Sequence, residues 1–411
     1  MKLIVDLLVW TCAAAWMIGS GAFALAQSPP HPSTESDSTG TSGDRSGAEQ
    51  PEVASESATP IVVEPIDVAL PGQPARGLSG LTSAQSESPA AARALDEPAF
   101  VTTVHIDDRV GETTSVAEVL SESMGVNVRS LGGLGGFSSV SVRGADSGHT
   151  AVFVDGVPLS RIASVTADLG RYSLDSLSEL ELYRGGVPAE LGGAALGGAL
   201  NLITAVGRPA SGRPLTLSLG AGSFGARHLR ARWRDSRDDG LAGFHLALGY
   251  AGSNGDFSYF NDNGTNLIQD DDTFVARDNN HYDQIDAVAR YRTERGSLTI
   301  DAGSRTLIKV QGIPGTASVQ SRSAELTTVS QLVDVAVRAP ALFGSPRLFG
   351  LASGFVGGEW QAYRDLDNEV GLGAQDRRYR SISTGFAGRA SIDGGPAQVI
   401  SLGADGRVDH F

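Results

Sequence analysis

Cysteine is almost absent from this chain. Cys12 is the only cysteine among 411 residues, and it lies in an apolar N-terminal segment that we expect to be removed. The mature protein is therefore predicted to form no disulfide. The seven histidines are scattered and make no HxxxH pair, so a zinc site is not expected. No recognisable Ser/His/Asp arrangement is present either, and we expect no cofactor, no metal and no enzymatic activity.

Positive charge is also scarce. Lys and Arg number 32 against 47 Asp and Glu, which gives a net charge of −15. Nucleic-acid binding depends on a basic surface that neutralises phosphates. We therefore do not expect a nucleic-acid partner.

Long apolar runs are confined to the N-terminus. Lys2 precedes a mostly apolar stretch, Leu3 to Phe23, and Ala24-Leu25-Ala26 has the small-x-small pattern of a cleavage site. We predict that residues 1–26 are a signal peptide, because this cleavage signal and the polar tract after it disfavour a membrane anchor. No later run approaches 18 apolar residues, so any membrane crossing has to use β-strands.

Composition divides the exported part into three segments. Residues 27–92 are rich in Ser, Pro, Thr and acidic residues and are predicted to be a disordered linker. A short apolar island, residues 59–68, interrupts it, and this island is either an accidental strand or a docking peptide. Residues 93–207 contain strand candidates, one short helix and several glycine pairs, which predicts a small mixed α/β domain with its own core.

Residues 208–411 alternate between apolar and polar side chains with period two. Leu215, Leu217 and Leu219 illustrate the pattern, and several strands carry arginine on the polar face. A soluble β-sandwich also alternates. The arginines and the long acidic connection from Asn254 to Asp283 favour antiparallel strands of a transmembrane β-barrel.

Two motifs suggest other chemistry and are set aside. Gly220 to Gly225 match a dinucleotide fingerprint, but that motif requires a following helix, and the next residues alternate as a strand. A hairpin turn is expected there. The acidic run Asp270 to Asp272 lacks the glycine spacing of a calcium loop, so a solvated loop is expected.

The segment from Phe100 to Thr204 resembles the plug domain of TonB-dependent outer-membrane receptors. Four motifs occur in the family's order: Met124 to Val128, Ser141 to Gly144, Val152 to Leu159, and Leu177 to Gly185 continuing at Glu190 to Thr204. The fold class that this resemblance implies is mainly β, with a small mixed α/β plug followed by part of a barrel of the 22-stranded type. The family motif and latch positions are Arg143, Gly144, Asp155, Gly156, Glu181, Arg184, Gly185, Gly197 and Gly198.

The resemblance also implies a function and partners. The apolar island is similar to a TonB box, with TonB contacts at Thr59, Pro60, Ile61, Val62, Val63 and Glu64. In this family, arginines such as Arg143 and Arg184 pair with barrel carboxylates and hold the plug. The implied protein resides in the outer membrane of a Gram-negative bacterium, in contact with lipid. It imports a small ligand such as a siderophore, cobalamin or metal complex with energy passed on by TonB.

Two alternatives remain at this level: a passive or signalling outer-membrane protein, and a non-functional soluble periplasmic fragment that binds ligand through the plug. The stretch from Arg213 to Phe411 is long enough for nine or ten membrane strands. A plug of about 100 residues needs a wider barrel than that. We therefore expect the chain to be a truncated receptor.

Overall fold

The structure is a computed structural model. It describes residues 101–106, 115–159, 166–185, 187, 191, 196–204, 206–207, 214–237, 240–265, 267–395 and 398–411. The predicted signal peptide, the linker and the TonB-box-like island lie outside these described residues.

The first unit, here the mixed domain (residues 101–204), is built on a five-stranded sheet with strand order β1-β6-β7-β4-β5. β4 and β7 run parallel, and the other neighbours are antiparallel. The five strands are β1 (Val101–His105), β4 (Thr150–Val154), β5 (Val157–Pro158), β6 (Glu179–Tyr183) and β7 (Gly198–Ile203). A separate hairpin joins β2 (Val126–Leu131) to β3 (Phe137–Val142).

One short helix covers this sheet. Helix α3 spans Val116–Ser121 and is the short helix expected in this segment. Ser115 and Glu118 form a capping box that satisfies the first free N–H groups of the helix. Its apolar face joins a buried core that contains Ile106, Leu120, Val152, Val154, Leu180 and Leu202. This confirms a small core within the mixed domain.

The second unit, the large sheet, has nine strands in the order β18-β17-β16-β15-β14-β13-β10-β9-β8, and every pair of neighbours is antiparallel. β8 and β18 form its two edges, so the described strands make a partial barrel. The strands are β8 (Leu215–Ala221), β9 (Arg227–Ser236), β10 (Ala242–Ser253), β13 (Tyr282–Arg295), β14 (Leu298–Gly312), β15 (Glu325–Ala339), β16 (Leu348–Asp365), β17 (Gln375–Gly395) and β18 (Gln398–His410).

The connections differ at the two ends of the large sheet. One end, the long-loop end, carries residues 222–226, 254–281, 313–324 and 366–374. At the other, the short-turn end, β9 is followed by β10, β13 by β14, β15 by β16 and β17 by β18. Two of the fingerprint-like glycines, Gly222 and Gly225, lie in the tight connection between β8 and β9, as expected. The longest connection contains a hairpin that the sequence pattern did not predict, β11 (Ser258–Asn261) with β12 (Thr273–Ala276).

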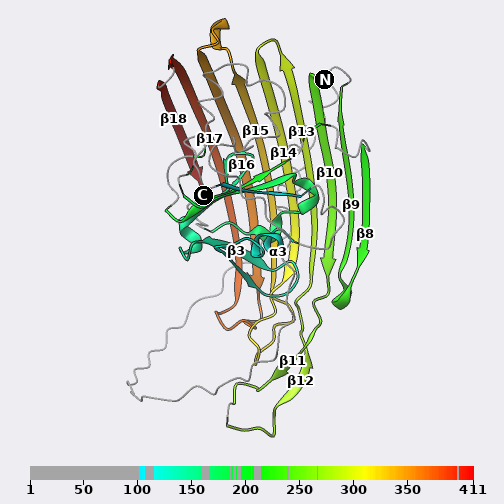
Figure 1. Ribbon diagram of the computed structural model, residues 1–411. Helices are drawn as coiled ribbons and strands as arrows, with labels where there is room; N and C mark the ends of the chain where they lie inside the picture. The colour runs from blue at the N-terminus through cyan, green and yellow to red at the C-terminus, as the bar shows by residue number, and fades with distance from the viewer. Residues whose placement is uncertain are drawn as a thin grey trace, which may run out of the picture.

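The mixed domain lies against one face of the large sheet, the plug face (Figure 1). The opposite, outward face is apolar and exposed to solvent in the isolated chain. Its exposed side chains include Leu217, Leu219, Leu229, Trp233, Leu248, Ile285, Val356, Phe386, Ile400 and Leu402. Period-two alternation therefore separates a charged inner face from an apolar outer one. No helix in the described part of the chain is long and apolar enough to cross a bilayer.

Candidate functional site at the plug face

A hairpin turn of the mixed domain reaches the large sheet. Asp155 and Gly156 join β4 to β5 with φ angles of 51° and 82°. Both angles lie in the left-handed region that such two-residue hairpin turns require, and aspartate and glycine tolerate it best. The Asp155 carboxylate accepts hydrogen bonds from the Thr204 backbone N–H and hydroxyl, both at 2.8 Å. The turn is therefore fixed to the end of β7.

Arg290 on β13 meets this turn in a buried cluster. Its guanidinium lies 2.7 Å from Asp155, 2.6 Å from Asp301 and 3.3 Å from Asp334. The side chains of Arg290 and Asp155 are only 8% and 7% exposed. Arg292 adds a second cation 2.7 Å from Asp301. Arg290 of the large sheet thus binds the Asp155 carboxylate of the mixed domain and, at the same time, Asp301 and Asp334 of the sheet itself.

Arg305 on β14 supports the same contact from the neighbouring strand. It donates to the Thr204 hydroxyl at 2.8 Å and to the Ser176 hydroxyl at 3.2 Å. Thr204 therefore lies between the Asp155 carboxylate and the Arg305 guanidinium. We name Asp155, Thr204, Arg290 and Arg305 the inner contact.

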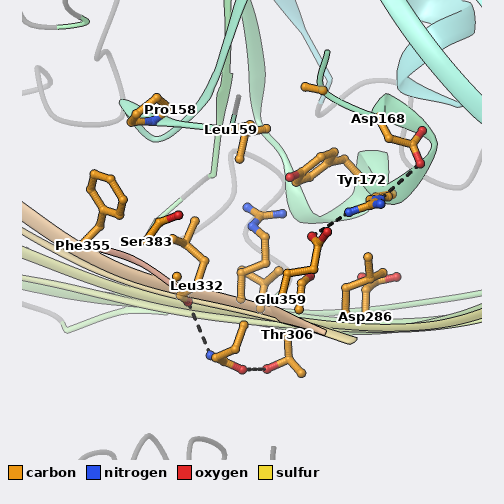
Figure 2. Close-up of a pocket in the computed structure, with 18 of the residues that line it drawn as sticks. Pro158, Leu159, Asp168, Tyr172, Asp286, Thr306, Leu332, Phe355, Glu359 and Ser383 are labelled. Carbon is orange, nitrogen blue, oxygen red and sulfur yellow. Dashed lines mark hydrogen bonds and ion pairs between the residues drawn. The ribbon is translucent and has the colours of Figure 1, made fainter. Parts of the chain in front are cut away.

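A second contact lies nearer the long-loop end and has the opposite polarity. Arg171 of the mixed domain donates to Glu359 on β16 at 2.8 Å. Asp168 also binds Arg171, at 3.2 Å, and accepts backbone hydrogen bonds from Ser138 and Gly170 at 3.0 Å. Figure 2 shows Glu359 projecting from the sheet towards the segment that carries Asp168 and Tyr172.

The neighbouring carboxylates keep Arg171 positively charged. Burial alone would lower its pKa, but the carboxylates of Glu359 and Asp168 raise the pKa above its ordinary value. The guanidinium therefore stays charged at any physiological pH. We name Asp168, Arg171 and Glu359 the outer contact.

Polar contacts beyond these two also join the units. Lys309 on β14 donates to the carbonyl of Gly135, in the glycine run between β2 and β3. Gln284 on β13 approaches the Arg171 carbonyl at 3.4 Å. These partners lie close to the long-loop end of their strands, so the glycine run faces that end.

Cavities remain between the contacts. One of about 230 Å³ adjoins the inner contact and is lined by Pro158, Tyr183, Asn201, Arg338 and Phe355 among others. A second, of about 100 Å³, lies between Leu159 and Tyr172 on one side and Leu332 and Glu359 on the other (Figure 2). The two units are therefore not packed as tightly as one continuous core.

The remaining motif residues lie inside the mixed domain. Glu181 is fully buried and accepts hydrogen bonds from Tyr183 at 3.0 Å and Asn201 at 2.9 Å. Asn201 in turn accepts from the Gly156 N–H at 3.1 Å. Gly198 has a φ of +136°, and an added Cβ there would lie 2.5 Å from the Tyr183 carbonyl oxygen. A Cβ on Gly197 would lie 2.4 Å from that of Ala145, so both glycines serve close packing.

The two motif arginines lie close to each other. Arg143 and Gly144 form a left-handed turn after β3, with φ angles of 55° and 74°. Arg184, followed by Gly185, donates to the Met124 carbonyl at 2.9 Å and to the Thr102 hydroxyl. Burial and the charge of Arg143 lower the pKa of Arg184. The described hydrogen bonds of Arg184 thus stay within the mixed domain instead of reaching a carboxylate of the sheet.

Beyond the motif and latch positions named from the sequence, the structure adds Arg171, Asn201, Thr204, Arg290, Arg305, Lys309 and Glu359. Arg290 does occupy a polar position in an alternating strand, which is a usable signal. Its partner lies 135 residues away, and no local pattern shows that pairing. Among the described residues, no group of three His, Cys, Asp or Glu side chains is placed to hold a metal ion.

Comparison with known proteins agrees with this architecture. Residues 93–199 match the family model of the TonB-dependent receptor plug domain. The fold is similar to that of the FrpB iron transporter from Neisseria meningitidis (F3-3 variant), with a TM-score of 0.60 and 15% identity over 75% of this chain and 49% of that one.

Two further solved structures show the same fold. The siderophore receptor PirA from Acinetobacter baumannii gives a TM-score of 0.56 at 14% identity, covering 75% of this chain and 48% of PirA. The ferric yersiniabactin uptake receptor FyuA from Yersinia pestis gives 0.54 at 13%, covering 78% and 50%. The chain thus spans about half the length of these proteins, which are receptors and transporters rather than enzymes. It carries a TonB-dependent receptor plug domain, followed by a partial β-barrel of the fold found in these receptors.

Proposed function

We propose that this chain belongs to an outer-membrane receptor that imports a small ligand, such as a metal chelate, with energy supplied through TonB. The observation that carries the proposal is the attachment of the plug domain to the inner face of the sheet. Among the described residues, the ion pairs that join the two units involve Asp155, Arg171, Arg290 and Glu359, and cavities lie beside them. Such an interface fixes the plug at rest and can separate without exposing a large apolar core.

The two faces of the large sheet support the membrane location. Apolar side chains point outward along the strands, where lipid would contact them, and charged side chains point towards the plug. Outer-membrane barrels have short periplasmic turns and longer external loops. The long-loop end is accordingly the external one in this proposal.

The ligand is proposed to enter from that end. A pocket of about 390 Å³ lies between the glycine run of the plug and the parts of β9, β10 and β13 near the long-loop end. Gly133, Gly135, Arg230 and Tyr282 are among its lining residues. A cationic and an aromatic side chain suit a small anionic or aromatic chelate. The similar solved structures include receptors whose names specify siderophores and iron.

TonB is proposed to bind the island at residues 59–64, together with the apolar residues up to Val68. An extended peptide that adds a strand to its partner depends on main-chain N–H groups, and proline removes one. Val62→Pro should therefore abolish energised uptake and leave ligand binding intact. Val53→Pro is the matched control, because it places the same residue in the linker outside the island.

Uptake of a radiolabelled iron chelate and its binding to de-energised cells measure the two steps separately. Uptake in Val62→Pro equal to that in Val53→Pro would sink the assignment of the TonB contact. Loss of binding in both variants would instead point to a folding defect, which immunoblotting of outer membranes detects.

A further inference from the structure

A groove of about 510 Å³ crosses the outward face of the large sheet over β10, β13 and β14. Its floor consists of short side chains, Ala287 and Ala289 on β13 and Ala302 on β14. Leu246 and Leu248 pair with these alanines from β10 and form one wall. The face is hollow here because a row of alanines lies beside taller leucines.

Aromatic rings close the groove towards the short-turn end. Trp233 and Phe244 stack edge to face with ring centroids 4.5 Å apart, and Phe244 is paired with Tyr291 across β10 and β13. Tryptophan and tyrosine collect at the level of lipid headgroups, where one end of the ring is wet and the other apolar. The groove therefore begins at an interfacial level and continues into the apolar band.

The outward face of β13 shows the same gradient along one strand. From near the long-loop end to the short-turn end its side chains are Ile285, Ala287, Ala289, Tyr291, Thr293 and Arg295. A membrane strand tilted by about 45° descends about 2.4 Å per residue. Tyr291 then lies about 10 Å and Ala287 about 19 Å below Arg295, and half of the hydrocarbon core is about 15 Å. The groove thus begins in the leaflet next to the short turns and extends to about the middle of the bilayer.

The polar side chains at the β14 rim of the groove do not require a polar ligand. The Gln331 side-chain amide on β15 donates to the Ser304 hydroxyl at 2.9 Å, and its Oε1 accepts a hydrogen bond from the Thr306 hydroxyl. Figure 2 shows Thr306 on the opposite side of the sheet from Glu359. These polar groups are already satisfied, so an apolar occupant leaves no unpaired hydrogen-bonding group behind.

We propose that this groove holds one acyl chain of a phospholipid whose phosphate lies on Arg295. The proposal rests on the proposed membrane location. Arg295 is exposed and ends the strand whose alanines form the floor, so its charge complements a phosphate above a chain in the groove. The groove is continuous with the apolar outward face, and its volume far exceeds the roughly 30 Å³ of a water molecule. A lipid chain fills it, whereas water gains no polar partner there.

Native mass spectrometry of the protein extracted from outer membranes in mild detergent tests the proposal. Wild-type protein should retain one phospholipid after washes that strip the annular lipid. Ala289→Trp fills the groove and should lower that retained fraction at least tenfold, and Arg295→Glu should lower it less. Ala352→Trp is the matched control, because Ala352 is exposed on the outward face of β16 and outside the groove.

A second measurement identifies the occupant directly. A photoreactive diazirine side chain at position 293 should cross-link to a phospholipid in intact cells. A protein cross-linked there instead, or equal lipid retention in Ala289→Trp and Ala352→Trp, would overturn the proposal. Absence of the wild-type protein from the outer membrane would remove the membrane location itself, whereas normal insertion without a retained lipid refutes the groove alone.

Discussion

The inner and outer contacts attach the same plug domain to the same sheet with opposite polarity. At the inner contact the plug supplies the carboxylate of Asp155 and the sheet supplies Arg290, and both side chains are at most 8% exposed. At the outer contact the plug supplies Arg171 and the sheet supplies Glu359, with 21% and 15% exposed. Because charge interactions strengthen as water is excluded, the inner contact is expected to be the stronger.

The two contacts also lie at different depths. Glu359 is at the level of Asp286 on β13 through the register of β14 to β16, four residues from Arg290. Four residues of strand correspond to about 14 Å. The inner contact is therefore the one closer to the short-turn end, where TonB would act in the proposed function. A pull from that end would act on the stronger, inner contact first. The outer contact, nearer the proposed entry of the ligand, would respond to ligand binding.

The largest effect is expected from removing the shared cation of the inner contact. Arg290→Ala leaves the carboxylates of Asp155, Asp301 and Asp334 together without their common partner. Breaking a buried pair from one side costs about 3–5 kcal/mol. The urea midpoint of unfolding of the detergent-extracted protein should fall accordingly, and the plug should become sensitive to protease.

Asp155→Asn and Arg378→Ala serve as the comparison variants. The first removes one negative charge but leaves Arg290 with Asp301 and Asp334. Its loss of stability should therefore be smaller than that of Arg290→Ala. The second removes an arginine whose pairing with Asp376 is 44% and 42% exposed, so little change is expected. Equal stability of Arg290→Ala and Arg378→Ala would show that the inner contact does not hold the plug.

These two contacts mark the limit of what the sequence could predict. Period-two alternation is a local property, so the strands of the large sheet, with arginine on their polar face, were predicted correctly. Asp155 and Gly156 were also singled out, as family motif positions. Which carboxylate meets Arg290 depends on how two folded units dock, and that was not predictable from either segment alone.

Other differences have equally local causes. The β11–β12 hairpin was missed because each strand has only four residues, too few to show alternation among its Asn and Asp neighbours. Motif spacing drew attention to Arg184 as a latch, yet the structure gives it carbonyl and hydroxyl partners inside the plug. Family motifs thus located the region of the interface better than they located its charged pairs.

A smaller effect is expected at the outer contact. Arg171→Gln and Glu359→Gln, alone and combined, form a double-mutant cycle whose coupling free energy should be about 1 kcal/mol, between exposed and fully buried pairs. Hydrogen exchange across residues 166–174 should increase in each single variant, while residues 150–155 at the inner contact should be unaffected. A coupling free energy equal to the loss in Arg290→Ala would mean that the two contacts do not differ in strength.

The smallest effect is expected in the connections at the long-loop end, beyond the outer contact. It distinguishes the pH dependence of these connections from that of the plug. Glu369 in the connection after β16 accepts hydrogen bonds from the backbone N–H groups of Arg322 and Ser323, both at 2.7 Å, and from the Ser321 hydroxyl at 2.8 Å. The backbone hydrogen bonds, first that of Ser323 and then that of Arg322, lower the pKa of Glu369 to about 2. Since the folded-state pKa lies below the ordinary value of 4.5, the stabilisation is fully present above pH 4.5 and is lost as the pH falls through about 2. Exchange protection of residues 321–324 should therefore persist at pH 4 and disappear in Glu369→Gln at every pH. Loosening of these loops between pH 6 and 4 in the wild type would contradict this, whereas loosening of residues 166–174 alone in that range would place the acid-sensitive attachment at the outer contact.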